Sequence, residues 1–417
     1  MRERGAHARI AIAGAWNIDL YRYLLRERLG KILGDRAGGT LIIALAMGDQ
    51  GGISSDQWRV MTHTGTNHLL AISGLHIGFV AGLVFLLVRW IWPLLGAAAD
   101  RIAAQRVAAL AALASAAIYS ALAGFSVPTQ RTLIMIGTWS VVQMLDRRAG
   151  MSEVLALALL AVLIFDPFSV LAPGFWLSLA AVAAIAWGMG CRIGKTGVWW
   201  RWGRVQVVVS VGLLPLLVLW FQQVPLLSIP TNLIAVPWIT LVTVPLVLLA
   251  CVALAFSATL AEGILHTALV SIDMVWRFLE ILSDLNFSLL PVPSPGVPAL
   301  ILALIGAAIL LAPRGVPGRW LGAAWMLPLL FPPGTGLSTG ELRLALLDVG
   351  QGLAAVVRTR QHTLLYDTGP RFSGDFSAGR AAVLPYLRHA GTRRVDVLVQ
   401  SHGDNDHIGG LADVLDG

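Results

Sequence analysis

Long apolar runs occupy most of the chain between residues 69 and 331. A helix that crosses the hydrocarbon core of a bilayer needs roughly 20 apolar residues. Segments that approach this length predict membrane spans at 69–89, 103–123, 129–145, 153–169, 174–190, 205–223, 229–251, 258–281, 298–312 and 320–331. Segment 229–251 contains Pro230, Pro237 and Pro245. Because each proline removes a backbone donor, we expect this segment to be kinked or broken.

A shorter periodic pattern precedes the first predicted span. In segment 17–33, one helical face carries Ile18, Tyr21, Leu25, Leu29 and Ile32, while the arginines and the lysine lie off that face. The pattern predicts an amphipathic helix that lies in the membrane interface.

Composition separates the chain into two parts. The sequence is 57% hydrophobic and only 13% charged, with a mean hydropathy of +0.75, which excludes a single water-soluble domain. From Glu341 onward, however, charges are as frequent as in soluble proteins. We therefore expect an α-helical polytopic membrane protein of about ten spans followed by a small α/β piece. The expected division is an interfacial segment at 1–60, a transmembrane domain at 61–335 and a C-terminal domain at 340–417.

The loop charges predict an orientation. Alternate loops hold the basic residues Arg89, Arg101, Arg106, Arg147, Arg148, Arg192, Lys195, Arg201, Arg204, Arg314 and Arg319, and the opposite loops hold none. The positive-inside rule places the basic loops in the cytoplasm and the C-terminal piece outside it. The N-terminal region is itself basic, which argues the other way.

Segment 258–281 and the residues just beyond it carry a polar stripe. Glu262, His266, Asp273, Arg277, Glu280 and Asp284 fall within about 60° of one another on a helical wheel. A charge at mid-bilayer costs roughly 2.5–3.5 kcal/mol, so the stripe needs water, a partner or headgroups. Two interpretations remain open: a helix that faces an aqueous path, and an amphipathic helix on the membrane surface. In the second case the loop alternation beyond it changes, and the predicted side of the C-terminal piece is weakened.

Polar residues also occur where the first predicted span begins. The run HLLAISGLHIG at 68–78 places His68, Ser73 and His76 in an apolar segment, and glycines at 74, 78 and 82 permit close helix approach. Taken alone, the run is typical of helix packing. Arg131, at the head of the third predicted span, is by default an arginine that extends to the interface.

These residues resemble a known family. HLLAISGLHIG is similar to the signature of the ComEC family, and ALAMGDQGGIS (44–54), YSALAGFSVPTQRTLIM (119–135), DPFSVLAPGFWLSLAAV (166–182) and LLSIPTNLIAVPW (226–238) resemble its competence domain in the expected order. The resemblance covers roughly residues 35–335 and continues into the C-terminal piece. It implies a multi-pass protein of the inner membrane that passes single-stranded DNA into the cell, together with the DNA-receptor and motor proteins of the competence machinery. A homo-oligomer is an open alternative to a monomer.

A DNA path needs polar and basic groups for phosphates and aromatic rings for bases. The residues predicted to line it are His68, Ser73, His76, Arg131, Glu262, Asp273 and Arg277. Phe175, Trp139 and Trp176 are aromatic candidates, although core packing explains them equally well. No G-x-x-x-x-G-K-[ST] loop is present, so ATP-driven motion would come from another protein.

The C-terminal piece combines short strands with a polar loop. Segments 342–348, 353–360, 363–367 and 395–400 read as strands, and 379–390 reads as a helix. The loop SHGDNDHIGG at 401–410 follows the last strand and supplies two imidazoles and two carboxylates. Such density is what a divalent metal site needs, whereas the alternative is a solvated polar loop.

This loop resembles the ligand motif of the metallo-β-lactamase fold, and the piece resembles the truncated start of such a domain. The resemblance implies His402, Asp404, Asp406 and His407 as metal ligands, with Asp406 also catalytic. An aspartate at position 404 makes the site harder, which favours manganese or magnesium beside zinc. DVGQG (348–352) and YDTG (366–369) match the opening strands, so that Asp348 and Asp367 lie near the site or cap turns. The resemblance implies that this domain is a nuclease outside the cytoplasm that acts on the strand that is not imported.

Two departures limit the resemblance. The later ligands of a dinuclear site are absent from residues 341–417, and most of the family's N-terminal OB-like domain is missing, so we expect a fragment with an incomplete metal site. The main alternative function is a membrane-anchored metallohydrolase for a non-DNA phosphoester, in which the spans only anchor the enzyme. A secondary transporter is less favoured, because no inverted repeat of broken helices is visible.

Overall fold

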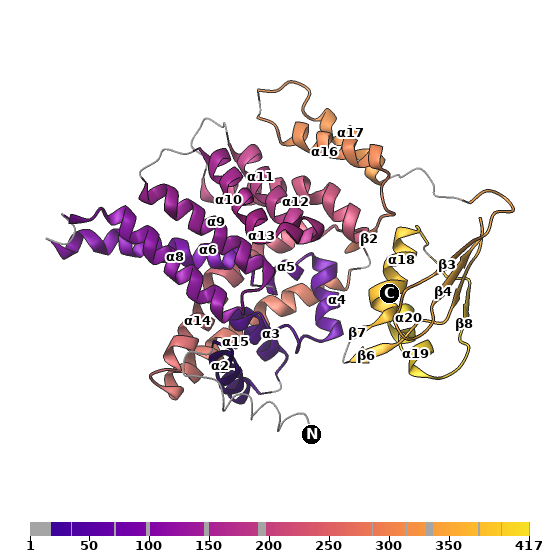
Figure 1. The fold of residues 1–417 in the computed structure, drawn as a ribbon, viewed down its shortest axis with the longest axis horizontal. Coiled ribbons are helices and arrows are strands. Elements are labelled where there is room, and N and C mark those ends of the chain that lie inside the picture. The colour runs from indigo at the N-terminus through magenta and orange to yellow at the C-terminus, as the bar shows by residue number, and fades with distance from the viewer. Residues whose placement is uncertain are drawn as a thin grey trace. The chain divides into compact units, whose positions relative to one another are not determined.

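The computed structural model describes residues 18–34, 36–70, 72–96, 101–145, 150–190, 197–285, 287–313, 315–330, 337–373, 376–392 and 394–416 (Figure 1). The basic loop residues Arg147, Arg148, Arg192, Lys195 and Arg314 lie outside this part. The chain divides into two compact units, Met1–Trp176 with Leu227–Ser288, and Leu177–Leu226 with Leu289–Gly417.

The first unit is helical. Its elements are α2 (Ile18–Leu33), α3 (Ala37–Met47), α4 (Ser55–Thr64), α5 (Asn67–Leu70), α6 (Gly74–Ile91), η1 (Trp92–Leu95), α8 (Ala104–Leu122), α9 (Val127–Met144), α10 (Met151–Phe165), η2 (Pro167–Leu171), α13 (Ser228–Trp238), η3 (Ile239–Thr243), α14 (Val244–Ala253) and α15 (Ala258–Ser283), and α11 (Pro173–Met189) begins in it. Helices α6 and α8 run side by side (Figure 1), and their core includes Ile77, Ala112, Ala116 and Tyr119.

The chain is a membrane protein with fewer long spans than the sequence predicted. Among the described residues, five helical segments are long and apolar enough to cross a bilayer: Gly74–Leu95, Ala104–Leu122, Trp200–Phe221, Ser228–Ala253 and Ala258–Ser283. Further apolar helices are shorter: Ala37–Met47, Ser152–Phe165, Pro173–Met189, Val297–Leu311 and Leu321–Leu330. A count of about ten spans is therefore not confirmed, because half of these helices are shorter than the roughly 20 residues that a perpendicular span needs.

The first long helix begins later than the apolar run suggested. Helix α6 starts at Gly74, with Ser73 extended at φ −90° and ψ 162°, so that His68 lies on the separate short helix α5. Gly74 lies against the Thr132 side chain of α9, as expected of a close helix contact. Gly78 and Gly82 were expected to do the same, but no heavy atom lies within 4 Å of the position of a Cβ at either residue.

The proline-rich segment changes its helical register without breaking. Helices α13 and α14 join through η3, a π-helix at Ile239–Thr243, and the three form one segment from Ser228 to Ala253. A π-helix follows Pro237 and precedes Pro245, so the missing N–H groups are accommodated by wider turns. Insertions of this kind are frequent at functional sites.

Helix α15 packs through one face only. Its buried face includes Leu265, Ile272 and Leu279, whereas the predicted polar stripe is exposed. An exposed apolar strip with Val270, Met274 and Ile281 adjoins the stripe. Since both strips are exposed, the structure is compatible with an aqueous path and with a membrane surface.

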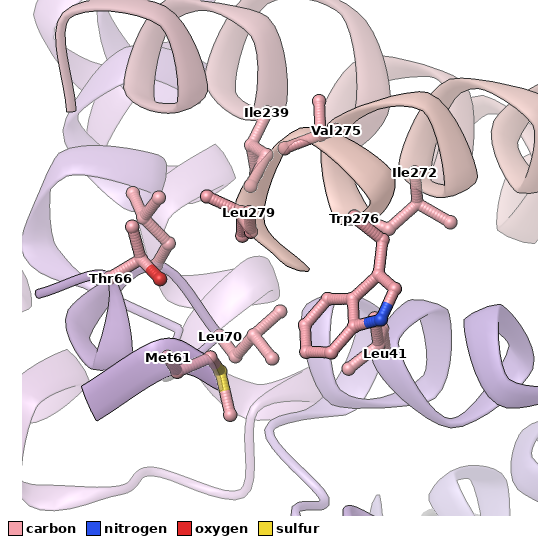
Figure 2. Close-up of a pocket in the computed structure, with 10 residues that line it drawn as sticks. Leu41, Met61, Thr66, Leu70, Ile239, Ile272, Val275, Trp276 and Leu279 are labelled. Carbon is pink, nitrogen blue, oxygen red and sulfur yellow. The ribbon is translucent and has the colours of Figure 1, made fainter. Parts of the chain in front are cut away.

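The buried face of α15 closes a small apolar pocket. Ile272, Val275 and Leu279 line it together with Ile239 of η3 and with side chains from α3, α4 and α5, and Figure 2 shows the Trp276 indole beside them. None of the residues predicted for the DNA path is among its lining residues. This pocket is therefore part of the helix packing and offers no polar route.

Helix α2 forms where the amphipathic helix was predicted, and it docks through an arginine. Leu29 and Leu33 are buried, while Ile18 and Tyr21, expected on the apolar face, are exposed. Arg22 Nε donates to the Leu122 carbonyl at 2.9 Å, and its Nη2 donates to the Met47 carbonyl at 3.4 Å. These carbonyls end helices α8 and α3, where a cation is favourable.

Replacement of this arginine tests the docking of α2. We expect Arg22→Ala to destabilise the first unit by about 1–2 kcal/mol, because two helix ends lose charged hydrogen bonds. The measurement is thermal unfolding of the detergent-solubilised chain, with hydrogen exchange of α2 amides. Arg28→Ala removes an exposed arginine of the same helix and should leave both unchanged. Equal effects of the two variants would contradict the proposed contact energy.

The second unit contains apolar helices and the C-terminal α/β region. Its elements besides the end of α11 are α12 (Val198–Phe221), β1 (Gln223–Pro225), β2 (Leu289–Pro291), α16 (Val297–Leu311), α17 (Leu321–Leu330), β3 (Arg343–Leu346), β4 (Ala355–Arg358), β5 (Thr363–Tyr366), β6 (Arg371–Ser373), β7 (Phe376–Ser377), η4 (Gly379–Val383), α18 (Leu384–His389), β8 (Val397–Val399), α19 (Asn405–Ile408) and α20 (Leu411–Asp416). Helices α16 and α17 pack closely at Gly306 and Gly322, and strands β1 and β2 pair antiparallel.

The C-terminal sheet has the order β3-β4-β5-β8 and confirms the predicted strands with shorter bounds. Its first three strands are antiparallel, and β8 pairs parallel to β5. One face of the sheet, with Val356 and Leu365, is buried in a core with residues of η4 and α18. The other face is also apolar but exposes Leu344 and Leu346.

Candidate metal centre

The parallel pairing of β5 and β8 brings two loops to one edge of the sheet. Because the strands run in the same direction, their carboxyl ends coincide, and Asp367 follows β5 where Ser401 follows β8. The Asp367 N–H donates to the Val399 carbonyl at 2.8 Å, which joins the two strand ends. The loop that the sequence singled out thus starts beside a second polar segment.

Asp367 is fully buried, and its carboxylate holds two residues of the loop 401–410 by hydrogen bonds. It occupies the left-handed region at φ 57° and accepts hydrogen bonds from the Ser401 N–H and the Ser401 hydroxyl, each at 2.7 Å. Its Oδ2 lies 2.7 Å from His407 Nδ1. Burial raises the pKa of the Asp367 carboxyl, but hydrogen bonds from Ser401 and His407 outweigh it, so the pKa lies below its ordinary value. An ionised Asp367 can only accept, which fixes the proton of His407 on Nδ1.

Both imidazoles of the loop therefore present Nε2 outward. The Ser401 hydroxyl gives its proton to Asp367, so it accepts from His402 Nδ1 at 2.9 Å. In the neutral form of each ring the proton is then on Nδ1, and Nε2 is the nitrogen that can bind a metal. A carboxylate that holds the other ring nitrogen is the usual support of a metal-bound histidine.

Three of the four predicted metal ligands lie close together in the structure. His402, Asp406 and His407 each offer a ligand atom within 4.8 Å of the others, and the two imidazole centroids are 3.9 Å apart. Two nitrogens and one carboxylate oxygen in this range suit zinc and manganese alike. The residues present therefore fit a divalent metal with open coordination positions.

Two other residues predicted for the metal site, Asp404 and Asp348, lie outside the group of three ligands. Asp404 lies 3.4 Å from Nε2 of His402, but it is outside the group of three, and its side chain is exposed. Asp348 is exposed and accepts from the Gly350 N–H at 3.2 Å, the turn-capping alternative left open by the sequence. Ser401 was not singled out, although its position directly before His402 could have suggested a supporting role.

Glycines fix the backbone that carries the ligands. The Thr368 N–H donates to the His407 carbonyl at 2.8 Å, and the Leu353 N–H donates to the Asp406 carbonyl at 3.2 Å. A Cβ at Gly352 would overlap the Asp406 carbonyl, and one at Gly410 would overlap the Thr368 carbonyl. These close approaches explain the glycines at position 352 in DVGQG and at position 410 in HIGG.

A second polar cluster supports the same region. Asp413 of α20 is buried and binds Arg371 at 3.1 Å, Arg380 at 2.6 Å and the Ser377 hydroxyl at 2.5 Å. The sequence pattern did not indicate this cluster, because its members come from three separate segments. It joins α20 to the β6–β7 hairpin and to η4.

The predicted path residues of the first unit are less concentrated. His76 is fully buried, and neither ring nitrogen has a partner in the described part of the chain. His68 is exposed and close enough for electrostatic interaction with it, whereas Ser73 is half-buried and makes no side-chain cap for α6. Arg131 is buried at 7% exposure.

The charges on α15 stand apart from these groups. Glu262, Asp273 and Arg277 are exposed. Among the described residues, no hydrogen bond or ion pair joins them to His76 or Arg131. The structure therefore does not assemble the predicted path residues into one contact network.

The sequence matches two protein-family models and is similar to several known proteins. A family model described as Competence protein matches residues 45–317, and one described as Metallo-beta-lactamase superfamily matches residues 347–416. The chain is 35% identical to Competence protein ComA of Neisseria gonorrhoeae over 95% of this chain and 55% of that protein. It is 29% identical to Recombination protein 2 of Haemophilus influenzae, over 90% of this chain and 52% of that protein. It is 25% identical to ComE operon protein 3 of Bacillus subtilis, over 88% of this chain and 48% of that protein.

No solved structure matches the chain. The chain spans about half the length of the curated relatives it matches. The competence match covers most of the membrane helices, and the metallo-beta-lactamase match covers the metal-ligand loop. This chain therefore belongs to the ComEC family of competence proteins, as its ordered motifs predicted.

Proposed function

We propose that this protein passes single-stranded DNA across the inner membrane during transformation. The observation that carries the proposal is the competence match over residues 45–317, which contains all five long apolar helices of the described residues. The first relative, at 35% identity, is named a competence protein. DNA-receptor and motor proteins, and further copies of the chain, are the proposed partners.

A polar path through the membrane part would use the residues that an apolar environment disfavours. Both ring nitrogens of His76, and Nε and Nη1 of Arg131, are buried without a hydrogen-bond partner in the described part of the chain, and the α15 stripe offers exposed charges. Buried polar groups without partners are costly, and ionisable residues inside a membrane protein are functional-site candidates by default. His68, Ser73, Glu262, Asp273 and Arg277 complete the proposed path.

We assign the C-terminal loop to metal-dependent cleavage of a phosphodiester on the extracytoplasmic side. A bound divalent ion, zinc or manganese, would lower the pKa of water and stabilise developing negative charge. His402, Asp406 and His407 would hold it, while Asp367 keeps His407 oriented. The second oxygen of Asp406 would accept the proton of the attacking water, the catalytic role assigned to this residue. Asp404 would supply an outer contact to His402.

A second function is favoured by the exposed face of α15. If its polar stripe faces lipid headgroups, the helices are only an anchor, and the metal loop acts on a non-DNA phosphoester. Hydrolysis of small phosphoesters by the purified chain with no action on DNA would favour this alternative.

Transformation tests the primary proposal. We expect deletion of the gene in a naturally transformable host to abolish transformation by added DNA and to leave transformation by electroporation unchanged. The gene should restore it, whereas His76→Ala should not, provided that the variant reaches the membrane in equal amount. Radiolabelled DNA should then remain outside the cytoplasm. Unchanged cytoplasmic entry in the deletion strain would refute the proposal.

A further inference from the structure

The segment around Arg131 combines a buried cation with a helix N-terminus. Arg131 is only 7% exposed, and its Nε and Nη1 have no hydrogen-bond partner among the residues that the structure describes. Its Nη2 lies 3.3 Å from the position of a Cβ on Gly174, in the first turn of α11. Two of the motifs that identified the family, at 119–135 and 166–182, therefore meet at this guanidinium.

A helix N-terminus cannot satisfy an arginine. Its free groups are N–H donors with a partial positive charge, and a guanidinium has only donors as well. Pro173 has no N–H, and the Phe175 N–H donates to the Ala172 carbonyl at 3.0 Å. Asp166 interacts electrostatically with Arg131, but among the described residues no carboxylate lies within ion-pair distance of it. The guanidinium of Arg131 and the N-terminus of α11 thus both contribute positive charge to this site.

Arg22 of the same unit shows the structural alternative. That arginine lies at two helix C-termini, where carbonyl groups accept from its Nε and Nη2. An arginine that only joins helices takes such acceptors. Arg131 has the opposite surroundings, so its buried N–H groups require an acceptor from outside the described chain.

The surface above Arg131 is open and aromatic. Gly174 is exposed, and Trp176 is 42% exposed. The Trp176 indole is fixed, since its Nε1 donates to the Val170 carbonyl at 2.8 Å and it meets Phe175 edge-on at 5.4 Å between centroids. A fixed, exposed indole offers a stacking surface for a nucleobase.

We propose that Arg131 and the first turn of α11 bind a backbone phosphate of single-stranded DNA, with a neighbouring base stacked on Trp176. A phosphate oxygen supplies the acceptor that the guanidinium lacks, and the helix N-terminus favours the same anion. A lipid headgroup would satisfy the arginine but would not use the indole. The inference rests on the proposed function and names the contact that this part of the protein makes with its substrate.

The test measures DNA binding by the full chain in nanodiscs of phosphatidylcholine. A fluorescein-labelled oligodeoxythymidylate is titrated at several salt concentrations and followed by anisotropy. Arg131→Gln should weaken binding about tenfold, the loss of one charged hydrogen-bond pair, and should reduce the slope of log K against log salt by about 0.7. Arg131→Lys should keep the slope. Trp176→Leu should weaken binding at least about fivefold with the slope unchanged.

Matched variants separate this site from general electrostatics. Arg89→Gln removes an exposed arginine of α6 and should leave affinity nearly unchanged. Gel-filtration elution and thermal unfolding of each variant verify the fold. Cross-linking of an iodouracil oligonucleotide should map to the peptide that contains Trp176 and should disappear in Trp176→Leu.

Three outcomes would overturn the inference. If folded Arg131→Gln binds DNA like the unsubstituted chain, this site is wrong and the proposed function stands. If only the response to added phosphatidylglycerol is lost, the site binds lipid headgroups. If the unsubstituted chain binds no DNA, the proposed function fails, and this site fails with it.

Discussion

Replacement of His407 by alanine is expected to abolish metal binding by the C-terminal loop. His407 contributes one of the three gathered ligand atoms, and its Nδ1 is held by the buried Asp367 at 2.7 Å. Loss of an outer-shell partner already costs about 10–100-fold in metal affinity. Loss of the ligand itself should therefore weaken zinc or manganese binding by at least about 100-fold.

The measurement is competitive calorimetric titration of zinc and manganese into the chelator-treated full chain in detergent. Asp367→Asn should weaken binding about 10–100-fold, because the amide no longer fixes the His407 proton on Nδ1. His362→Ala removes an exposed histidine of the same region and is the matched control.

The same titration with an Asp404 variant determines whether the metal has three or four protein ligands. The sequence motif predicted it as a ligand, while the structure leaves it outside the group of three. Asp404→Ala should reduce affinity much less than Asp406→Ala. Equal losses in the two variants would restore the four-ligand set, and an equal loss in His362→Ala would show that binding is not at this loop.

The membrane class and the strand sequence of the C-terminal region could be predicted, because both depend on local patterns. Runs of apolar residues and alternating strands carry their information within a few neighbouring positions. Span length was less predictable. The run from 69 to 89 is mostly apolar, so a span was predicted over its whole length. The helix nevertheless begins at Gly74, where the Thr132 side chain of another helix lies close to the backbone.

For the metal loop, the residue types were predictable and their roles were not. His402, Asp406 and His407 come from one segment, so proximity in sequence indicated proximity in space. The supporting role of Asp367 depends on the parallel pairing of β5 with β8, which joins segments 34 residues apart. The same limit applies to Arg131, whose neighbour Gly174 belongs to a different helix.

The exposed apolar face of the C-terminal sheet also depends on how separate segments pack, which the sequence pattern does not specify. Leu344 pairs with Val357, and Leu346 pairs with Ala355, so each strand is apolar on both sides. Strands of this kind occur in sheets that are covered on both faces. The sequence showed apolar strands, and only the structure shows that helices cover one face while the described residues leave Leu344 and Leu346 exposed.

Replacement of Gly410 by alanine should unfold the metal loop, in contrast to replacement of Gly403 a few positions earlier. A Cβ at Gly410 would overlap the Thr368 carbonyl and meet the backbone of Gly379 at 2.5 Å, and neither can yield as a flexible side chain would. Backbone overlap in a packed loop costs about 3 kcal/mol or more, a large part of the stability of a small domain. Because the Gly410 N–H also donates to the Gly369 carbonyl, the strain reaches the segment that carries Asp367.

Gly403 provides the control within the same loop, since no heavy atom lies within 4 Å of its Cβ position. Gly403→Ala should leave metal affinity and protease resistance unchanged. Gly410→Ala should make residues 343–416 susceptible to pulsed proteolysis at low denaturant and should remove the metal affinity that His402 and His407 provide. Both readouts are needed, because a loop that loses metal while it resists proteolysis would indicate a direct effect on the ligands. If Gly410→Ala behaves like Gly403→Ala in both, the close packing of Gly410 against Thr368 does not position the candidate site.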